Sequence, residues 1–243
     1  MDVHFILLMI GAYLLGSVPS AYLAMRWSRG VDIRQRGTGN VGAANVFSTG
    51  PRWLAVPVTL FDISKGALPV WAAQSLGMNV AQQVSVGLCA IIGHNWPVFL
   101  HFRGGRGVFA SLGVITLISP KLGLIIFVGP YLFAPFRQVA LGVFAALVAL
   151  PFLSWFASQP LNIEHRLPVT MGFAAISLIG LSKRVLAPRT PLSESVPLGK
   201  LIITRTLFDR DIMDRKVWLS RLHEAEEPAD EMLDQGEEKK AAC

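Results

Sequence analysis

Long apolar segments, separated by short loops, run through most of this chain. The first covers residues 3–25, about 23 residues, and a helix of that length crosses a hydrocarbon core of roughly 30 Å. Six more lie at residues 54–76, 80–100, 108–118, 122–136, 138–157 and 167–186. Only 16% of the residues are charged, against roughly a quarter in soluble domains. The sequence therefore predicts an all-α, polytopic membrane protein with about seven transmembrane helices.

The charges of the loops predict how these segments are oriented. If the loop after the first segment lies inside, eleven Lys and Arg residues of the loops fall inside, and only Lys121 and Arg166 fall outside. Basic residues favour the cytoplasmic side of a membrane. We therefore expect the N-terminus outside and the C-terminus in the cytoplasm.

The distribution of charge divides the chain into two expected parts. Residues 1–189 carry 14 Lys and Arg but 4 Asp and Glu, and are expected to form the membrane-embedded domain. Residues 190–243 carry 8 and 12, and form the expected cytoplasmic tail. In this tail we expect an amphipathic helix at residues 209–221 and disorder in the acidic residues 224–243. The basic loops suit anionic headgroups, so membrane lipids are expected partners and nucleic acid is not.

Two glycine-rich segments with arginines stand out, at residues 34–45 and 93–107. Closely spaced glycines let backbone N–H groups approach a phosphate, and guanidinium groups pair with phosphate oxygens. The first segment adds the side chains of Thr38 and Asn40, and the second places Arg106 after two glycines. Both are expected on the cytoplasmic face. They predict two halves of one anion-binding site at the membrane surface.

Two features inside the apolar segments allow more than one interpretation. Asp62 and Lys65, at i and i+3, share one helix face and can pair, either lining the site or as a structural ion pair near the interface. In the first segment, Pro19 follows small residues. This pattern indicates either a packing kink or a substrate passage lined by Ser17 or Ser20.

Several chemical motifs are missing from the sequence. None of the five His residues has an acid five positions later, and there is no Walker A sequence, G-x-S-x-G elbow or metal-ligand cluster. A reaction that needs a strong built-in base is therefore not expected, and we expect no metal or other cofactor. Transfer from an already activated donor is compatible with these absences.

The motifs resemble those of the acyl-phosphate-dependent glycerol-3-phosphate acyltransferases of bacteria. The resemblance covers roughly residues 1–190 and is carried by four segments: Gly16–Pro19, Asp32–Asn45, Asp62–Gly66 and Gly93–Gly107. It implies a seven-span, N-out fold in the bacterial plasma (inner) membrane, with the active site facing the cytoplasm. It also implies an enzyme of phospholipid biosynthesis that moves a fatty acyl group from acyl phosphate to sn-glycerol 3-phosphate, giving lysophosphatidic acid.

The motifs and the resemblance together define a candidate site. We expect catalytic roles for Thr38, Asn40, His94 and Arg106. We expect substrate binding by Ser17, Arg34, Gly39, Asn45, Asp62, Lys65, Arg103, Gly104, Gly105 and Gly107. Arg103, Arg106 and the backbone of the two glycines between them would hold the donor phosphate, and Thr38, Asn40 and Asn45 would position the acceptor. For His94, a structural hydrogen-bonded role and a proton-carrying role both stay open.

The chain also departs from the family pattern. Thr38 stands for a Ser, Arg106 for a Lys, and Ser48 for an Arg that holds the acceptor in the family. The family's His-Arg-x-Asn-Ile ending is replaced by residues 182–186, Ser-Lys-Arg-Val-Leu. Lys183, Arg184 or Arg189 can replace these contacts, or the acceptor is a different polar alcohol. A non-catalytic lipid-binding or transport protein is the third alternative.

Overall fold

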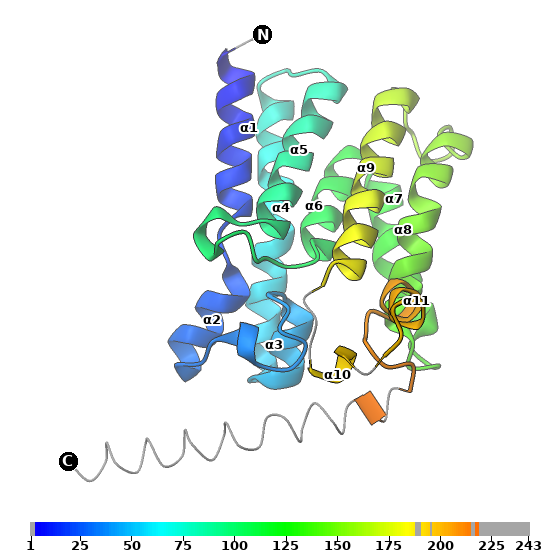
Figure 1. The fold of residues 1–243 in the computed structure, drawn as a ribbon. Helices are drawn as coiled ribbons and strands as arrows, with labels where there is room; N and C mark the ends of the chain where they lie inside the picture. The colour runs from blue at the N-terminus through cyan, green and yellow to red at the C-terminus, as the bar shows by residue number, and fades with distance from the viewer. Residues whose placement is uncertain (1–2, 188–190, 195, 215–216, 219–243) are drawn as a thin grey trace, which may run out of the picture.

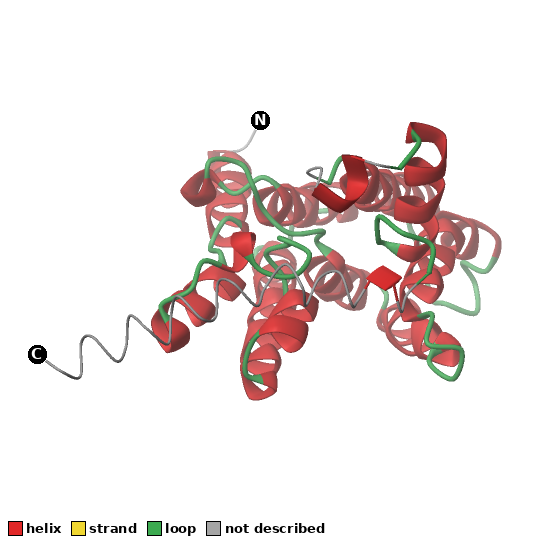
Figure 2. Ribbon diagram, turned by 60° about the horizontal axis from the view of Figure 1, so that its bottom comes forward, coloured by secondary structure: helices red, strands yellow, loops and turns green. Residues whose placement is uncertain are grey.

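The computed structural model describes residues 3–187, 191–194, 196–214 and 217–218, and these residues contain no strand (Figures 1 and 2). Seven helices form the body: α1 (Val3–Gly16), α4 (Ala55–Ser75), α5 (Val80–Asn95), α6 (Val108–Ile118), α7 (Pro120–Val128), α8 (Val139–Phe156) and α9 (Arg166–Val185). Four more are α2 (Ser20–Arg29), α3 (Ala43–Thr49), α10 (Pro191–Glu194) and α11 (Leu198–Phe208). The prediction of an all-helical protein is confirmed for the described residues.

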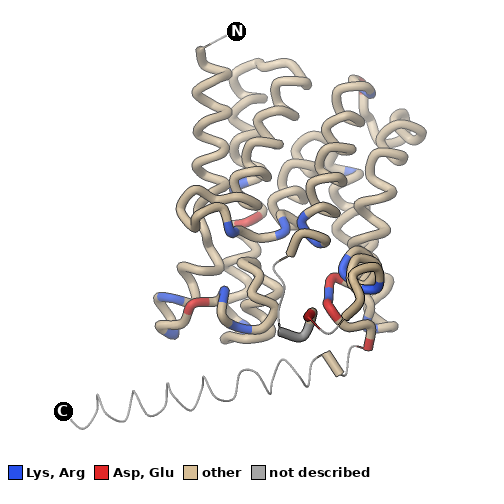
Figure 3. The backbone as a smooth tube through the Cα atoms, in the orientation of Figure 1, with Lys and Arg blue, Asp and Glu red and all other residues tan. Residues whose placement is uncertain are grey.

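The seven body helices stand side by side, and α2, α3, α10 and α11 lie at the end opposite the start of α1 (Figure 1). Three helical segments of the described chain are long and apolar enough to cross a membrane: Val3–Arg29, Val80–Leu100 and Val139–Phe156. Two shorter apolar ones are Val108–Ile118 and Pro120–Phe133. Figure 3 shows Lys and Arg gathered mainly in the half of the molecule that holds α2, α3 and α11.

The first apolar segment is not one continuous helix, as residues 3–25 were expected to be. α1 ends at Gly16 and α2 begins at Ser20, because Pro19 has no N–H and disfavours helical geometry in the residue before it. Ser17 still donates its backbone N–H to the carbonyl oxygen of Tyr13, at 2.9 Å. The break leaves the three residues between the helices with backbone groups that other elements can bind.

Small residues set the close contact between α4 and α6. A Cβ placed on Gly66 would lie 2.0 Å from the carbonyl oxygen of Ala110, and one on Gly113 would lie 2.1 Å from that of Ile63. No real side chain fits at such distances. The two glycines therefore allow the helix backbones to touch, as small residues do at helix interfaces in membranes.

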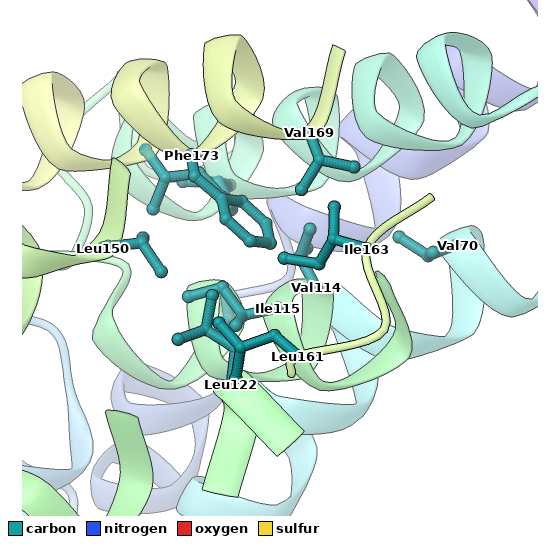
Figure 4. Packing of buried hydrophobic residues seen from close by; sticks show 12 residues of the cluster. Val70, Val114, Ile115, Leu122, Leu150, Leu161, Ile163, Val169 and Phe173 are labelled. Carbon is teal, nitrogen blue, oxygen red and sulfur yellow. The ribbon is translucent and has the colours of Figure 1, made fainter. Parts of the chain in front are cut away.

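The largest apolar cluster lies between α5, α6, α8 and α9. Phe173 of α9 and Leu150 of α8 are fully buried and pack with Val114 and Ile115 of α6 (Figure 4). In a lipid environment such interlocking contributes mainly through dispersion contacts. The cluster fixes α9 against α5 and α6, and so fixes the end of α9 beside the second glycine-rich segment.

The tail differs from the expectation at one point. Its described helices are α10 and α11; α11 ends at Phe208, and Asp209 follows with a left-handed backbone (φ 59°). Residues 209–214 are not helical, so the amphipathic helix expected at 209–221 does not begin where predicted. The expected disordered stretch, residues 224–243, lies outside the described residues. α11 packs against α8 and α9.

Candidate active site

A buried cluster of charged and polar groups lies where α4 meets the break between α1 and α2. Asp62, 1% exposed, accepts a hydrogen bond from the hydroxyl of Ser20, at 2.7 Å. The same oxygen, Oδ1, pairs with Nζ of Lys65 at 2.8 Å. The expected i, i+3 pairing of Asp62 and Lys65 is thus present in the structure, and each charge offsets the cost of burying the other.

The broken helix supplies a second partner of Lys65. Nζ of Lys65 donates to the carbonyl oxygen of Val18, at 3.1 Å. That carbonyl belongs to the segment whose regular helical bonding Pro19 interrupts. Ser17 is fully buried and its hydroxyl donates to the carbonyl oxygen of Tyr13, at 2.8 Å. The break therefore buries the hydroxyl of Ser17 and presents the carbonyl oxygen of Val18 to Lys65.

His94 reaches the same cluster from the end of α5. Its Nδ1 lies 3.7 Å from Oδ1 of Asp62, beyond hydrogen-bond distance, and has no hydrogen-bond partner among the described residues. A Cβ on Gly105 would lie 2.2 Å from Nε2 of His94 and 2.6 Å from the carbonyl oxygen of Val41. Gly105 thus lets the imidazole and the first glycine-rich segment meet the second one.

One pocket joins these elements. It is a small pocket lined by Gly16, Ser17, Val18, Pro19, Ser20, Val41, Lys65, His94, Pro97, Gly104 and Gly105. All four segments that carry the family resemblance contribute to this lining. The two glycine-rich segments lie on the same side of the molecule and line one small pocket together, as a single anion site requires.

The first glycine-rich loop is organised from within by Asn45. The amide nitrogen of this 2%-exposed residue donates to three backbone carbonyls, those of Ile33, Arg36 and Asn40, at 3.0–3.3 Å. Its amide oxygen accepts the backbone N–H of Thr38, at 3.1 Å. All the side-chain groups of Asn45 are engaged within the loop, so the residue holds the loop in shape.

Backbone N–H groups that were expected to face a phosphate are also engaged inside this loop. The N–H of Gly39 donates to Arg36 (2.9 Å) and that of Asn40 to the hydroxyl of Thr38 (3.3 Å). In the second segment, Gly105 donates to the carbonyl oxygen of His94, at 3.1 Å. Each of these three N–H groups therefore already has an internal acceptor in this conformation.

Arg34 is committed to a neighbour outside the pocket. Its guanidinium pairs with Asp32 at 2.6 Å and lies 5.3 Å from the centre of the Tyr22 ring. The hydrogen bond from Arg34 holds the pKa of Asp32 below its usual value, and the carboxylate raises the pKa of Arg34. Asp32 also accepts the backbone N–H of Arg34, so the pair closes the turn before the loop.

Three predicted site residues flank Gly104 and Gly105 in the chain but do not line the pocket: Arg103, Arg106 and Gly107. Arg103 is exposed, and Arg106 forms an ion pair with Asp209. Gly107 has a left-handed backbone (φ 72°) that starts α6, and a Cβ there would lie 2.5 Å from the side-chain oxygen of Asn95. Asn95 is fully buried, and neither polar atom of its side chain has a partner among the described residues.

The end of α9 approaches the second segment. Nζ of Lys183 donates to the carbonyl oxygen of Asn95, at 2.8 Å, and lies 5.0 Å from the centre of the Trp96 ring. Arg184 is 2% exposed and donates to the carbonyl oxygens of Ala140 and Thr206. Of the two described residues among the three expected to replace the missing family ending, Lys183 directly contacts the motif. Arg189 lies outside the described residues.

The structure thus brings together Ser17, Asp62, Lys65, His94, Gly104 and Gly105. Thr38, Gly39, Asn40, Asn45, Arg34, Arg103, Arg106 and Gly107 surround this group without lining the pocket. Sequence reasoning missed Val41, Asn95 and Asp209. Val41 and Asn95 lie within segments that carry the family resemblance, so the sequence offered a signal for both. Asp209 lies in a tail of mixed charge, where the sequence offered none.

The family described as "Glycerol-3-phosphate acyltransferase" matches residues 6–185. Glycerol-3-phosphate acyltransferase 5 of Dehalococcoides mccartyi is 43% identical over 221 residues, 91% of this chain and 95% of the relative. Glycerol-3-phosphate acyltransferase 4 of the same species, strain CBDB1, is 43% identical over 217 residues, 89% and 94% of the two chains.

A solved structure agrees with these relatives. It is a crystal structure of PlsY (YgiH), an integral membrane glycerol 3-phosphate acyltransferase, in its glycerol 3-phosphate form, with 32% identity and a TM-score of 0.66. The match covers 74% of this chain and 88% of that one. The match to acyltransferase 5 spans 221 of the 243 residues, so 22 residues lie outside it. Because α11 ends 35 residues before residue 243, the match extends through this tail helix. With its apolar helices and this neighbour, the protein is a membrane protein, and the chain belongs to the glycerol-3-phosphate acyltransferase family.

Proposed function

We propose that this membrane protein transfers a fatty acyl group from acyl phosphate to sn-glycerol 3-phosphate, giving lysophosphatidic acid for phospholipid synthesis. The observation that carries the proposal is the pocket to which all four family segments contribute, with Lys65 and His94 in its wall. The membership of the family and the likeness to an acyltransferase solved with glycerol 3-phosphate support it.

The chemistry requires little from the protein beyond binding and orientation. A hydroxyl oxygen of glycerol 3-phosphate attacks the acyl carbonyl carbon, a new ester C–O bond forms, and the C–O bond to phosphate breaks. Inorganic phosphate leaves with the electron pair of that bond. A phosphate oxygen of the acceptor, glycerol 3-phosphate, takes the hydroxyl proton. Because the donor is already activated, positioning and charge stabilisation supply the rate enhancement.

The proposed roles follow from where the side chains lie. Lys65, fixed by Asp62 and the Val18 carbonyl, provides positive charge at the pocket. Arg103 and Arg106 hold the donor phosphate at its edge. Thr38 and Asn40 offer side-chain donors to the acceptor, and Arg34 and Asn45 maintain the loop that presents them.

We also infer the finer topology from the arrangement of the helices. The seven body helices are the seven spans, with the start of α1 outside and the pocket end facing the cytoplasm of the plasma membrane. The gathering of Lys and Arg at the pocket end supports this orientation (Figure 3). Both phosphorylated substrates would then reach the pocket from the cytoplasmic side.

Purified protein supplied with acyl phosphate and glycerol 3-phosphate should release inorganic phosphate and form lysophosphatidic acid. Arg106→Ala should lower the turnover by about 100-fold, because a positive donor at the transferring group is lost. Arg29→Ala, which removes an exposed arginine of α2, is the matched control and should behave like the wild type. Robust turnover by Arg106→Ala would refute the role given to this arginine.

A different acceptor is the second candidate, and one side chain favours it. Ser48, which replaces an arginine of the family pattern, is exposed, and its hydroxyl is bonded to the backbone of Ala44 and Asn45. It therefore offers no charge to an acceptor phosphate. Phosphate release that requires another polar alcohol in place of glycerol 3-phosphate would support this alternative, and lipid binding without any release would support a non-catalytic protein.

A further inference from the structure

The tail is attached to the bundle by buried, charge-assisted hydrogen bonds. Nε of Arg205, a residue of α11 that is 4% exposed, donates to Oδ1 of Asp211 at 2.6 Å. Arg205 also donates to two backbone carbonyl oxygens at the end of α9, those of Val185 and Ala187, at 3.3 and 2.5 Å. Arg184 of α9 donates in the other direction, to Thr206 of α11. Such bonds hold α11 in a fixed position beside the end of α9.

Directly after α11, the carboxylate of Asp209 contacts the second glycine-rich segment. Asp209 follows α11 with φ 59°, a conformation that Asp tolerates better than most residues. Its Oδ2 forms an ion pair with Nη1 of Arg106, and both side chains are 18% exposed. The other oxygen, Oδ1, is buried without a partner among the described residues. The tail thus reaches the proposed donor-phosphate arginine through one contact.

The charges around Arg106 make this contact consequential. Lys183 and Arg184 of α9 both lie close enough to be affected by the charge of Arg106, and Asp209 lies close enough to affect Arg184. Three like charges repel, and a flexible arginine relieves the repulsion by turning toward solvent. One carboxylate among them holds the guanidinium in place. The group keeps a positive excess, which suits a doubly charged phosphate.

We propose that Asp209 is a positioning residue for acyl transfer. It occupies one donor of Arg106 and thereby orients the remaining donors of the planar guanidinium toward the substrate phosphate. The anchoring of α11 by Arg205 and Arg184 gives Asp209 the rigid support that such a role needs. This inference rests on the proposed function, and it gives the tail helix a part in the site.

The test measures phosphate release by the full chain at varied glycerol 3-phosphate and acyl phosphate concentrations. Asp209→Asn should lower kcat/KM on the order of 10- to 100-fold, because misplacement of a binding group is costly even when it is small. Asp209→Glu, which keeps the charge, should recover most of the activity. Asp214→Asn, a change at an exposed acid of the same tail, should have the wild-type kcat/KM.

Two further measurements separate positioning from loss of structure. In an Arg106→Ala background, Asp209→Asn should produce no further decrease, because the effect passes through Arg106. The thermal unfolding midpoint of Asp209→Asn should match that of Asp214→Asn, because the buried anchor at Arg205 remains. Unchanged kinetics of Asp209→Asn, an equal decrease in the Arg106→Ala background, or tighter substrate binding would each overturn the inference.

Binding of inorganic phosphate provides a readout that does not depend on turnover. Wild-type protein should bind phosphate more tightly than Asp209→Asn, and Arg106→Ala should remove the difference. If the wild type releases no phosphate from acyl phosphate with any acceptor, the proposed function fails. The phosphate-binding comparison still decides whether Asp209 orients Arg106, and equal affinities would reject it.

Discussion

At the scale of single residues, Asp62 connects the buried polar groups of the site. One of its oxygens contacts Ser20 and Lys65 and lies near His94, so three elements depend on one carboxylate. The sequence indicated the pairing with Lys65, because residues three apart on a helix share a face. It could not indicate Ser20 as a partner, because that contact depends on where the broken first segment packs.

Removal of one member of the Asp62–Lys65 pair should be more harmful to folding than removal of both. Lys65→Met leaves a buried carboxylate unpaired, and should lower the free energy of unfolding by about 3–5 kcal/mol. Adding Asp62→Leu should restore much of that stability, because the unpaired charge is gone. Thermal unfolding in detergent should give the lowest midpoint for Lys65→Met, below both the wild type and the double variant.

The activity of the double variant distinguishes the two interpretations of the pair. If Lys65 lines the site, the double variant should fold but release no phosphate from acyl phosphate. Wild-type turnover by the stable double variant would show that the pair is structural only.

Other residue roles were not readable from the pattern of the sequence. The guanidinium of Arg34 and the amide of Asn45 are groups that bind phosphates in many proteins. In this structure both form hydrogen bonds within their own loop, Arg34 to Asp32 and Asn45 to backbone carbonyls. A local pattern shows which groups are present and leaves open which acceptor each one finds. Asp209 is the extreme case, since its partner Arg106 lies 103 positions earlier.

At the scale of elements, helix positions follow from the sequence more closely than helix ends. The apolar segments expected at residues 108–118 and 138–157 correspond to α6 and α8 within a residue or two. The first segment breaks at Pro19, a kink that the sequence indicated without showing that α1 would stop there. Tail helix α11 was missed, because it covers an apolar run with β-branched residues that gives no helical periodicity.

The contact between α4 and α6 should be sensitive to a single methyl group. Gly66→Ala places a Cβ where the carbonyl oxygen of Ala110 now lies at 2.0 Å, so the helices must separate. We expect a loss of about 1–3 kcal/mol in the free energy of unfolding, the usual cost of overpacking. The matched control is Gly11→Ala on α1, where no atom lies within 4 Å of the new Cβ. Equal unfolding midpoints for the two variants would contradict this account of the contact.

At the scale of the whole molecule, the proposed orientation of the helices across the membrane can be tested directly. With Cys89 and Cys243 replaced by Ser, single cysteines at Gln159 and Glu164 should react with an impermeant thiol reagent from outside intact cells. Cysteines at Arg29 and Gln35 should react only after the membrane is opened. All four positions are exposed and lie outside the pocket lining. The reverse labelling pattern would invert the proposed orientation.

The separation between the start of α1 and the pocket end has a practical consequence (Figure 1). An affinity tag or a fiducial fused ahead of Val3 would sit at the end of α1 opposite Gly16, the residue of this helix that lines the pocket, and would obstruct neither substrate. Shortening the chain within α11 would strip Arg205 from the carbonyls it covers and leave Arg106 without its counter-ion. Protein for crystallisation or electron microscopy is therefore best tagged at its amino end.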